Sequence, residues 1–328
     1  MPEVSRFFRL ASGGGSLPPN YPTGNWFARI GTVFGAKGAR AIIFGRTASA
    51  FSRLPAMKAL LKKFFAMLDV FGFFERDPFG NVLFVKRMLM LALGVGTYGR
   101  LNITNKLRLE GTEHLENLPP RGVLFLSNHQ TYFMDVIAMF HVFFSVKWGF
   151  HNTINYPIYL LAPKARLYYV AASETMKDSG LIPRILAQGG AITVERSWRA
   201  KGQDVKREVD KSASDKVERA LKFGWVVSFP QGTTSPYAPI RKGTAHLIKQ
   251  TNPIVVPVVI NGFRRAFDKK GLFMKKRGTQ LSIRFKEPIR FDPELSVEEI
   301  VEQVKGFIEQ EVPEGKRWYV PKVKAGQV

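Results

Sequence analysis

The chain has 328 residues, 45% of them hydrophobic, so it can bury a sizeable core as one large domain with an appendage or as two modest domains. Its 49 Lys and Arg against 26 Asp and Glu give a formal net charge of +23, which favours anionic partners. No cysteine is present, which excludes disulfides, thiolate metal sites and a cysteine nucleophile. No nucleic-acid-binding motif accompanies the charge, so we expect no nucleic-acid partner.

Residues 1–100 are basic and aromatic, and we expect them to form a helical, membrane-associating N-terminal region without a secretory signal. Residues 57–71 predict an amphipathic helix with lysines beside its apolar face, suited to a lipid interface; an ordinary core-facing helix is the alternative. Residues 82–98 contain an unbroken apolar stretch from Met88 to Val95. Since a spanning helix needs about 20 apolar residues, we interpret this segment as interfacial or re-entrant.

Residues 94–99, Gly-Val-Gly-Thr-Tyr-Gly, match the glycine spacing of a dinucleotide-binding loop. That site requires a helix starting at the glycines. Here Leu101, Ile103, Leu107 and Leu109 alternate with polar residues, which predicts a strand instead. We therefore expect no nicotinamide site.

Residues 101–328 predict an α/β catalytic domain with a C-terminal helix and a basic tail, in which a mixed, largely buried sheet is flanked by helices. A helix is expected at 297–309, with Ser296 and Glu299 as its capping box. Pro257 cannot donate to a strand ladder, so an edge position or a bulge is expected there. The expected strands are short apolar runs at 107–110, 123–126, 167–170, 191–194, 225–229, 254–260 and 281–285.

His129 and Asp135 follow the apolar run at 122–126, which is expected to bring them to the carboxyl edge of the sheet. A neutral imidazole can take a proton from an alcohol, and a carboxylate on its other nitrogen fixes the tautomer and stabilises the imidazolium. The alternative is a core histidine followed by a helix-capping aspartate. The other histidines lack a ligand-like spacing with acidic residues, so no metal site is expected.

Three further segments end predicted strands. The strand at 191–194 is followed by Arg196, whose planar guanidinium suits phosphate or carboxylate, although a surface ion pair is the commoner role. The strand at 225–229 breaks into Pro230-Gln231-Gly232-Thr233-Thr234-Ser235, a turn whose backbone N–H groups suit an anion or oxyanion site, or a plain loop. The run at 254–260 is expected to be buried.

The order and spacing of these four blocks, over residues 107–289, resemble the glycerolphosphate and lysophosphatidic acid acyltransferase family. The resemblance implies that His129 is the general base, that Asp135 orients it, and that Arg196 binds the phosphate or headgroup of the acceptor. It also implies that the turn from Pro230 to Ser235 lines the acceptor site.

Two departures bear on these roles. The family usually has four residues between the histidine and the aspartate, whereas here there are five, 130–134. On a regular helix the extra residue rotates Asp135 by about 100°, so the pair can meet only if a loop or bulge absorbs it. In the third block the family has an acidic residue and an arginine, but this chain has Gln231 and Thr234 at those positions. Arg196, Arg241 and Lys242 remain as residues that could recruit a phosphate.

The expected activity is transfer of a fatty acyl group from acyl-CoA or acyl-carrier protein, as co-substrate, to a lysophospholipid-type acceptor such as 1-acyl-glycerol-3-phosphate, without a cofactor. The alternatives are transfer to a non-phosphate lyso-lipid such as a lyso-aminolipid, hydrolysis of acyl thioesters or esters, and lipid binding without catalysis. Because of its charge and apolar N-terminal segments, the enzyme is expected on the anionic cytoplasmic face of the cell membrane, peripheral or monotopic.

Overall fold

The computed structural model describes residues 75–163, 166–177, 181–195, 199–200, 203–204 and 211–312. The chain divides into two compact units, Met1–Phe65 and Ala66–Val328, and all described residues belong to the second. The amphipathic helix expected at 57–71 and the candidate residue Arg196 lie outside the described residues. The predicted boundary near residue 100 stays a prediction.

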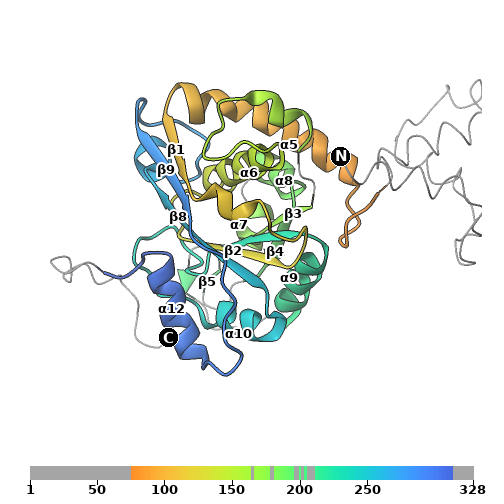
Figure 1. Cartoon of the computed structure of the whole chain (residues 1–328), viewed down its shortest axis with the longest axis vertical. Helices are drawn as coiled ribbons and strands as arrows, with labels where there is room; N and C mark the ends of the chain where they lie inside the picture. The colour runs from red at the N-terminus through yellow and green to blue at the C-terminus, as the bar shows by residue number, and fades with distance from the viewer. Residues whose placement is uncertain are drawn as a thin grey trace, which may run out of the picture. The chain divides into compact units, whose positions relative to one another are not determined.

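A seven-stranded mixed sheet, in the order β1-β9-β8-β2-β7-β3-β4, forms the centre of this unit (Figure 1). The five strands from β8 to β4 run parallel, while β9 is antiparallel to β8 and β1 is parallel to β9. The predicted mixed α/β fold and all seven predicted strands are confirmed. The strand bounds are β1 Lys106–Glu110, β2 Val123–Ser127, β3 Leu167–Ala172, β4 Ala191–Val194, β7 Trp225–Ser228, β8 Ile254–Asn261 and β9 Gln280–Phe285.

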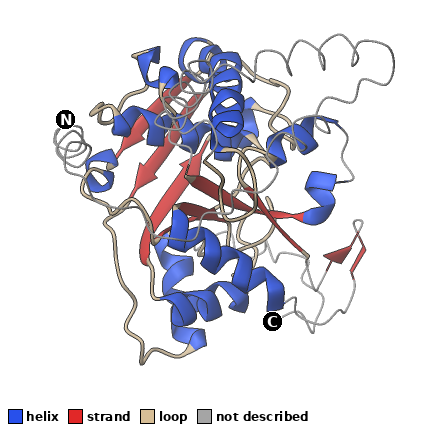
Figure 2. Ribbon diagram, turned by 90° about the vertical axis from the view of Figure 1, so that its right-hand side faces the viewer, coloured by secondary structure: helices blue, strands red, loops and turns tan. Residues whose placement is uncertain are grey.

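Helices cover both faces of the sheet, which lies as a layer between them (Figure 2). In β2, Val123 and Phe125 pack toward α6, whereas Leu124 and Leu126 pack toward α9, α10 and α12. Burial on both faces explains why this strand is apolar without alternation. The longer helices are α5 Leu83–Tyr98, α6 Met134–Lys147, α9 Lys211–Phe223, α10 Lys242–Thr251 and α12 Val297–Phe307; the shorter elements are η1 Gly99–Ile103, η2 Thr112–Leu115, η3 Pro157–Leu161, α7 Ser173–Lys177, α8 Leu181–Ala187, α11 Phe263–Ala266 and the pair β5 Arg199–Ala200 and β6 Gln203–Asp204.

Helix α12 begins as its sequence predicts. The Ser296 hydroxyl accepts the Glu299 N–H at 3.2 Å, and the Glu299 carboxylate accepts the Ser296 N–H at 2.7 Å. Both bonds satisfy backbone donors that the first helical turn would otherwise leave without partners. The helix ends at Phe307, two residues before the predicted end.

Helix α5 buries a stripe of residues at helical spacing, including Leu83, Met90 and Gly94. A Cβ at Gly94 would lie 2.5 Å from Leu160, so glycine permits the close contact between α5 and η3. The glycines at 94–99 thus lie at the end of a helix and not at its beginning, which agrees with the rejection of a dinucleotide loop. Within the described residues, no helix has the length and apolar character needed to cross a membrane.

Two local predictions are wrong. The strand expected from Leu101 onward begins only at Lys106, because Gly99–Ile103 form a π-helical turn in which Leu101 is buried and Ile103 exposed. Of the two alternatives expected for Pro257, an edge position or a bulge, the edge position is wrong, since β8 lies between β9 and β2. The pairing of β8 with β9 covers Val258 to Asn261 and does not include Pro257, and on the N-terminal side of Pro257 a bridge joins Val255 to Ile289. Proline has no N–H to donate, and Pro257 lies in this gap in the pairing.

Candidate active site

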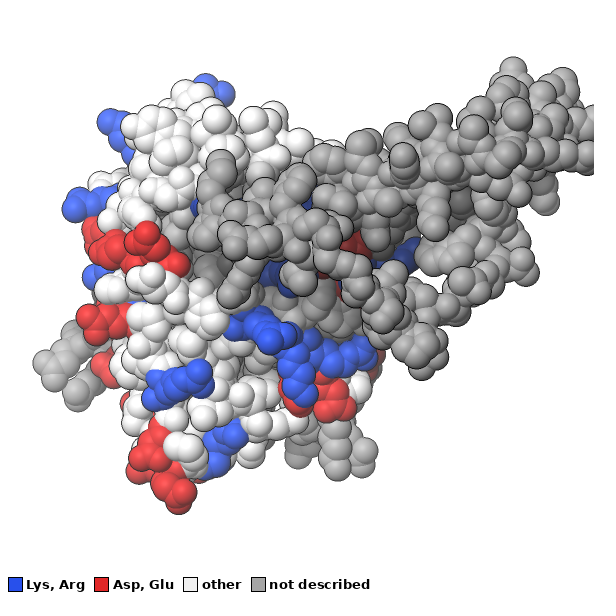
Figure 3. Space-filling view, turned by 45° about the vertical axis from the view of Figure 1, so that its right-hand side comes forward, with Lys and Arg blue, Asp and Glu red and all other residues white. Residues whose placement is uncertain are grey.

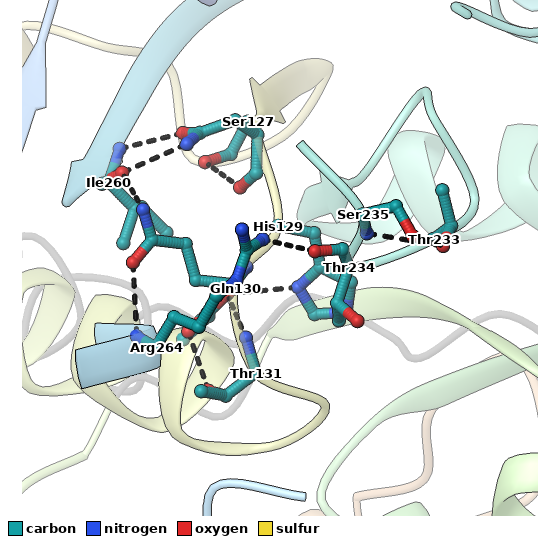
Figure 4. Close-up of polar contacts among 11 residues, drawn as sticks. Ser127, His129, Gln130, Thr131, Thr233, Thr234, Ser235, Ile260 and Arg264 are labelled. Atoms are coloured by element: carbon teal, nitrogen blue, oxygen red, sulfur yellow. Dashed lines mark hydrogen bonds and ion pairs between the residues drawn. The ribbon is translucent and has the colours of Figure 1, made fainter. Parts of the chain in front are cut away.

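The sheet brings three of the four sequence blocks together at one edge. Strand β2 is parallel to β7 on one side and to β8 on the other, with Leu126 opposite both Ser228 and Pro257. The residues that follow these strands therefore meet at their common carboxyl edge, which is where parallel sheets place ligand sites. His129 and Phe229 are brought together in this way. Gln130, the residue after His129, contacts Ile260 at the end of β8 (Figure 4).

His129 and Asp135 are in contact despite the extra residue between them. His129 Nδ1 lies 2.9 Å from Asp135 Oδ2. Residues 128–133 form a loop, and α6 starts only at Met134, so the two side chains do not share a helix. The loop therefore accommodates the additional residue, as the sequence analysis required if His129 and Asp135 were to be in contact.

Asp135 is fully buried and accepts several hydrogen bonds from the loop that precedes it. Its Oδ2 accepts the N–H groups of Gln130 at 2.6 Å and Thr131 at 3.0 Å, and its Oδ1 accepts the Thr131 hydroxyl at 2.6 Å. Since a carboxylate only accepts, the His129 Nδ1–H must donate to it, which leaves Nε2 as a proton acceptor. The aspartate thus shapes the loop and selects the tautomer of the His129 imidazole.

Phe229 adds a contact that the sequence analysis did not single out. Its ring stacks on the His129 imidazole with a centroid distance of 3.8 Å and an interplanar angle of 18°. The His129 side chain is 13% exposed, so the stacked ring covers one face and part of the imidazole stays accessible. Phe229 directly follows β7, and the parallel pairing of β7 with β2 was the signal that would have placed it beside His129.

Two amides next to His129 attach its loop to the end of β8. The Asn128 side chain donates to the Ile260 carbonyl at 2.9 Å and accepts the Ile260 N–H at 2.7 Å, as a strand neighbour would. Gln130 also donates to the Ile260 carbonyl, at 3.0 Å, and its Oε1 accepts the Arg264 N–H at 3.1 Å (Figure 4). His129 is therefore held from both sides along the chain.

The second half of the loop is held by residues 268–271. The Tyr132 and Phe133 N–H groups donate to the carbonyls of Lys269 and Lys270, each at 3.0 Å. Gly271, with φ +78°, lies so close that a Cβ there would be 2.7 Å from the Met134 nitrogen and 2.9 Å from the Thr131 hydroxyl. The start of α6, and with it Asp135, is thus placed by a segment more than 130 residues away in the sequence.

The turn at 230–235 is closed by its own hydrogen bonds. Gly232, with φ +64°, donates its N–H to the Phe229 carbonyl at 2.9 Å, and the Pro230 carbonyl accepts the Arg241 N–H at 2.9 Å. The Thr233 hydroxyl accepts the Ser235 N–H at 3.2 Å. The Gly232 N–H is therefore engaged within the turn.

The remaining predicted substrate-binding residues are placed differently from one another. The Gln231 side chain is buried, donates to the Ala238 carbonyl at 2.8 Å and to Gln310 at 3.1 Å, and so holds the turn near the end of α12. Lys242 makes an exposed ion pair of 2.9 Å with Glu298. Arg241 is the N-cap of α10, while Arg196 lies outside the described residues. Binding of substrate by these residues stays a prediction.

An apolar cavity of about 30 Å³ lies behind the loop, between α5, α6 and β3, with Phe133 in its wall. His141 also lines it, and burial lowers the pKa of this imidazole to about 4. Thr97 donates its hydroxyl to the Leu93 carbonyl and lies 2.9 Å from His141 Nε2, while the Tyr159 hydroxyl lies 2.7 Å from Nδ1. His141 is thus a neutral residue of the core that joins α5, α6 and η3.

No group of three or more His, Asp or Glu side chains in the described part of the chain is arranged to hold a metal ion. The polar groups near His129 include the Asp135 carboxylate, side-chain amides and backbone N–H groups. In such an arrangement the imidazole can remove a proton from a hydroxyl, and the carboxylate can stabilise the imidazolium that forms.

Comparison with known proteins gives two similarities. The family model described as Acyltransferase matches residues 108–261, from β1 to the end of β8. The crystal structure of the 1-acyl-sn-glycerophosphate (LPA) acyltransferase PlsC from Thermotoga maritima is 19% identical in sequence, with a TM-score of 0.42, over 70% of this chain and 80% of that chain. No curated protein sequence matches this chain significantly.

Proposed function

Because the family model described as Acyltransferase matches residues 108–261, we propose that this chain transfers a fatty acyl group from an acyl thioester to a hydroxyl of a lysophospholipid-type acceptor such as 1-acyl-glycerol-3-phosphate. The observation that carries the proposal is the 2.9 Å contact between His129 Nδ1 and the buried Asp135 carboxylate. This contact leaves Nε2 as a base at the carboxyl edge of the sheet.

In the proposed mechanism His129 Nε2 takes the proton of the acceptor hydroxyl as its oxygen attacks the thioester carbonyl. A carbon–oxygen bond forms, the carbon–sulfur bond then breaks, and the thiolate that leaves takes the proton back from His129. Asp135 stabilises the imidazolium between these steps. The nucleophile is the substrate itself, so no covalent enzyme intermediate is required.

We assign the backbone N–H groups of Thr233 and Thr234 to the oxyanion of the tetrahedral intermediate. The Gly232 N–H already donates to the Phe229 carbonyl, whereas in the described residues these two N–H groups have no acceptor. The stacking of Phe229 on His129 brings the base and this turn side by side.

The donor in this proposal is a fatty acyl thioester of CoA or of acyl-carrier protein, used as co-substrate without a resident cofactor. Both carriers are anionic and would be attracted by the net charge of +23. The second candidate function is acyl transfer to a lyso-lipid without a phosphate, such as a lyso-aminolipid, which is favoured by the lack of a charged side chain in the turn from Pro230 to Ser235.

We further propose that the enzyme works on the anionic cytoplasmic face of the cell membrane as a peripheral or monotopic protein. Val85, Met88 and Val95 of α5 and Ile158 and Leu161 of η3 are exposed, and α5 contacts η3, which supports an apolar surface there. On the face drawn in Figure 3, Lys and Arg side chains form a continuous band near the centre. Apolar and basic surfaces together favour an anionic lipid interface.

This location predicts binding to vesicles that depends on both lipid charge and salt. In sedimentation with vesicles, the protein is expected to bind phosphatidylglycerol-containing vesicles strongly at low salt and vesicles of phosphatidylcholine alone weakly, because screening and loss of lipid charge remove the attraction. Equal binding to both vesicles at low salt would contradict the electrostatic part of the proposal.

The catalytic proposal predicts that replacing His129 abolishes transfer. With radiolabelled acyl-CoA and 1-acyl-glycerol-3-phosphate in detergent micelles, His129→Ala should lower kcat about 100- to 10,000-fold, which is the usual contribution of a general base. His246→Ala, which removes an exposed imidazole on α10, is the matched control and should retain activity.

The products distinguish the remaining alternatives. Labelled phosphatidate supports the proposal, and labelled acyl product only from an acceptor without phosphate supports the second function. Release of labelled fatty acid with no acylated product would instead indicate a hydrolase. If the wild-type protein binds lyso-lipid but shows no turnover, both acyltransferase functions and the hydrolase function are wrong.

A further inference from the structure

Arg264 joins the two segments that flank His129. It lies in α11, which starts at Phe263 and has Gly262, with φ +89°, as its N-cap directly after β8. Its backbone N–H donates to Gln130 Oε1 at 3.1 Å, and its guanidinium donates to the Thr234 carbonyl. Gln130 is the residue after His129, and Thr234 belongs to the turn that follows Phe229. Figure 4 shows the Arg264 side chain reaching across the site from the end of β8 to this turn.

No acidic side chain among the described residues neutralises the charge of this guanidinium. The Arg264 side chain is partly buried, and no carboxylate of the described residues lies within ion-pair distance of it. A partly buried cation without a counterion is unfavourable unless an anion arrives. The adjacent Arg265 is exposed, so the two arginines of α11 have different surroundings.

The turn itself supplies no charge. Residues 230–235 contain no ionisable side chain, Gln231 is buried against Ala238 and Gln310, and Lys242 is paired with Glu298. A guanidinium held beside the Thr234 carbonyl therefore brings positive charge to a turn that has none. Its planar fork can bind a phosphate through two parallel hydrogen bonds.

We propose that Arg264 binds the phosphate of the acceptor and thereby selects anionic lyso-lipids. The inference rests on the proposed function and adds to it the residue that decides between a phosphate-bearing acceptor and a lyso-aminolipid. Thr234 orients the guanidinium and Gln130 holds the start of α11, so the phosphate is bound at a defined distance from the His129 base.

The test compares Arg264→Gln with Arg265→Gln, its neighbour on the same short helix. With 1-acyl-glycerol-3-phosphate as acceptor, Arg264→Gln should raise KM about 10- to 100-fold, as loss of a charged hydrogen bond predicts, while kcat changes much less. With uncharged monoacylglycerol the variant should match the wild type, and the KM for acyl-CoA should stay unchanged. Arg264→Lys should recover part of the loss, and Arg265→Gln should behave as wild type.

Other results would overturn the proposal. An unchanged KM for the phosphate-bearing acceptor removes the role, and a rise confined to the KM for acyl-CoA assigns the guanidinium to the donor. An equal loss of activity with monoacylglycerol shows that Arg264 only supports the turn. If Arg264→Gln has a lowered Tm, the KM values for the two acceptors are compared in Arg264→Lys instead, which retains the charge but lacks the planar fork.

A binding measurement separates this proposal from the proposed function. Isothermal titration of 1-acyl-glycerol-3-phosphate into micelle-bound protein, with no donor, should show weaker binding for Arg264→Gln and wild-type binding for Arg265→Gln. If the wild type transfers no acyl group, the proposed function fails, and this titration still decides on Arg264. Identical titrations for wild type and Arg264→Gln overturn the phosphate assignment even when transfer is observed.

Discussion

His129 owes its orientation to two neighbours of different kinds. Asp135 accepts from Nδ1 at 2.9 Å and so leaves Nε2 as the nitrogen that can accept a proton, while Phe229 stacks on the ring at 3.8 Å and restricts its rotation. A base is efficient only when its lone pair points at the proton to be removed. In the proposed mechanism the aromatic contact therefore supports catalysis although it carries no charge.

Phe229→Ala is expected to lower kcat about 10-fold or more with a smaller change in KM, because the imidazole loses its stacking partner and samples unproductive orientations. Steady-state kinetics with the acyl-CoA and lyso-lipid pair measure this. Phe273→Ala, which removes a ring that is 72% exposed, is the control. An unchanged kcat for Phe229→Ala would mean that Asp135 alone orients the ring.

The loop between β2 and α6 is the element on which the site depends. It is held at one end by Asn128 and Gln130 on Ile260, and at the other by the carbonyls of Lys269 and Lys270. Its interior hydrogen bonds converge on Asp135. A displacement of residues 268–271 is therefore transmitted to the His129–Asp135 pair.

Gly271→Ala should disturb the loop more than a comparable glycine replacement elsewhere. The new Cβ would lie 2.7 Å from the Met134 nitrogen, whereas a Cβ at Gly278, also at positive φ, would have nothing within 4 Å. Both substitutions carry a backbone cost of about 1 kcal/mol, but only Gly271→Ala also needs the start of α6 to move. Activity corrected for folded fraction should fall in Gly271→Ala and not in Gly278→Ala; equal activities would contradict this role.

The packing of α5 on the sheet includes a buried cation. Lys86 is 1% exposed, donates to the Leu167 carbonyl at 2.6 Å and lies 3.8 Å from the Tyr168 ring centroid. Burial lowers the pKa of its ammonium to about 7, an effect that the charge of Asp77 opposes. The folded molecule thus carries a lysine that releases its proton near neutral pH.

This burial predicts how global stability depends on pH. Between about pH 7 and 10.5 the unfolded chain holds a proton on Lys86 that the folded protein does not, so the free energy of unfolding rises with pH across this range. The rise amounts to roughly 5 kcal/mol for the full shift, at about 1.36 kcal/mol per pKa unit. In denaturant titrations, Lys86→Met should show a flatter dependence over this range than the wild type.

The control is Lys222→Met, which replaces a side chain that is 72% exposed and should keep the slope of the wild type. The slope is the relevant quantity, since Lys86→Met also leaves the Leu167 carbonyl without its donor and changes stability by an amount that does not depend on pH. Parallel curves for Lys86→Met and wild type would show that the buried ammonium does not titrate in this range.

Features that depend on neighbours in the sequence were predictable from it. The buried strands follow from short apolar runs, and the start of α12 follows from Ser296 and Glu299, because periodicity and capping involve residues only a few positions apart. His129 and Asp135 were recognisable as a pair for the same reason. The alternation of apolar and polar residues from Leu101 wrongly predicted a strand there, because Gly99–Ile103 form a π-helical turn before β1.

Contacts between distant segments required the folded molecule. Asp135 reaches His129 because residues 268–271 hold the loop between them. Phe229 stacks on His129 because β7 pairs with β2. Arg264 lies near Gln130 because β8 is the other neighbour of β2. Strand order in a sheet is a property of the whole chain, and no local pattern encodes it. The sequence by itself therefore identified His129 and Asp135 as a pair, whereas the contacts that orient them and the position of the Arg264 guanidinium came from the packing of the sheet.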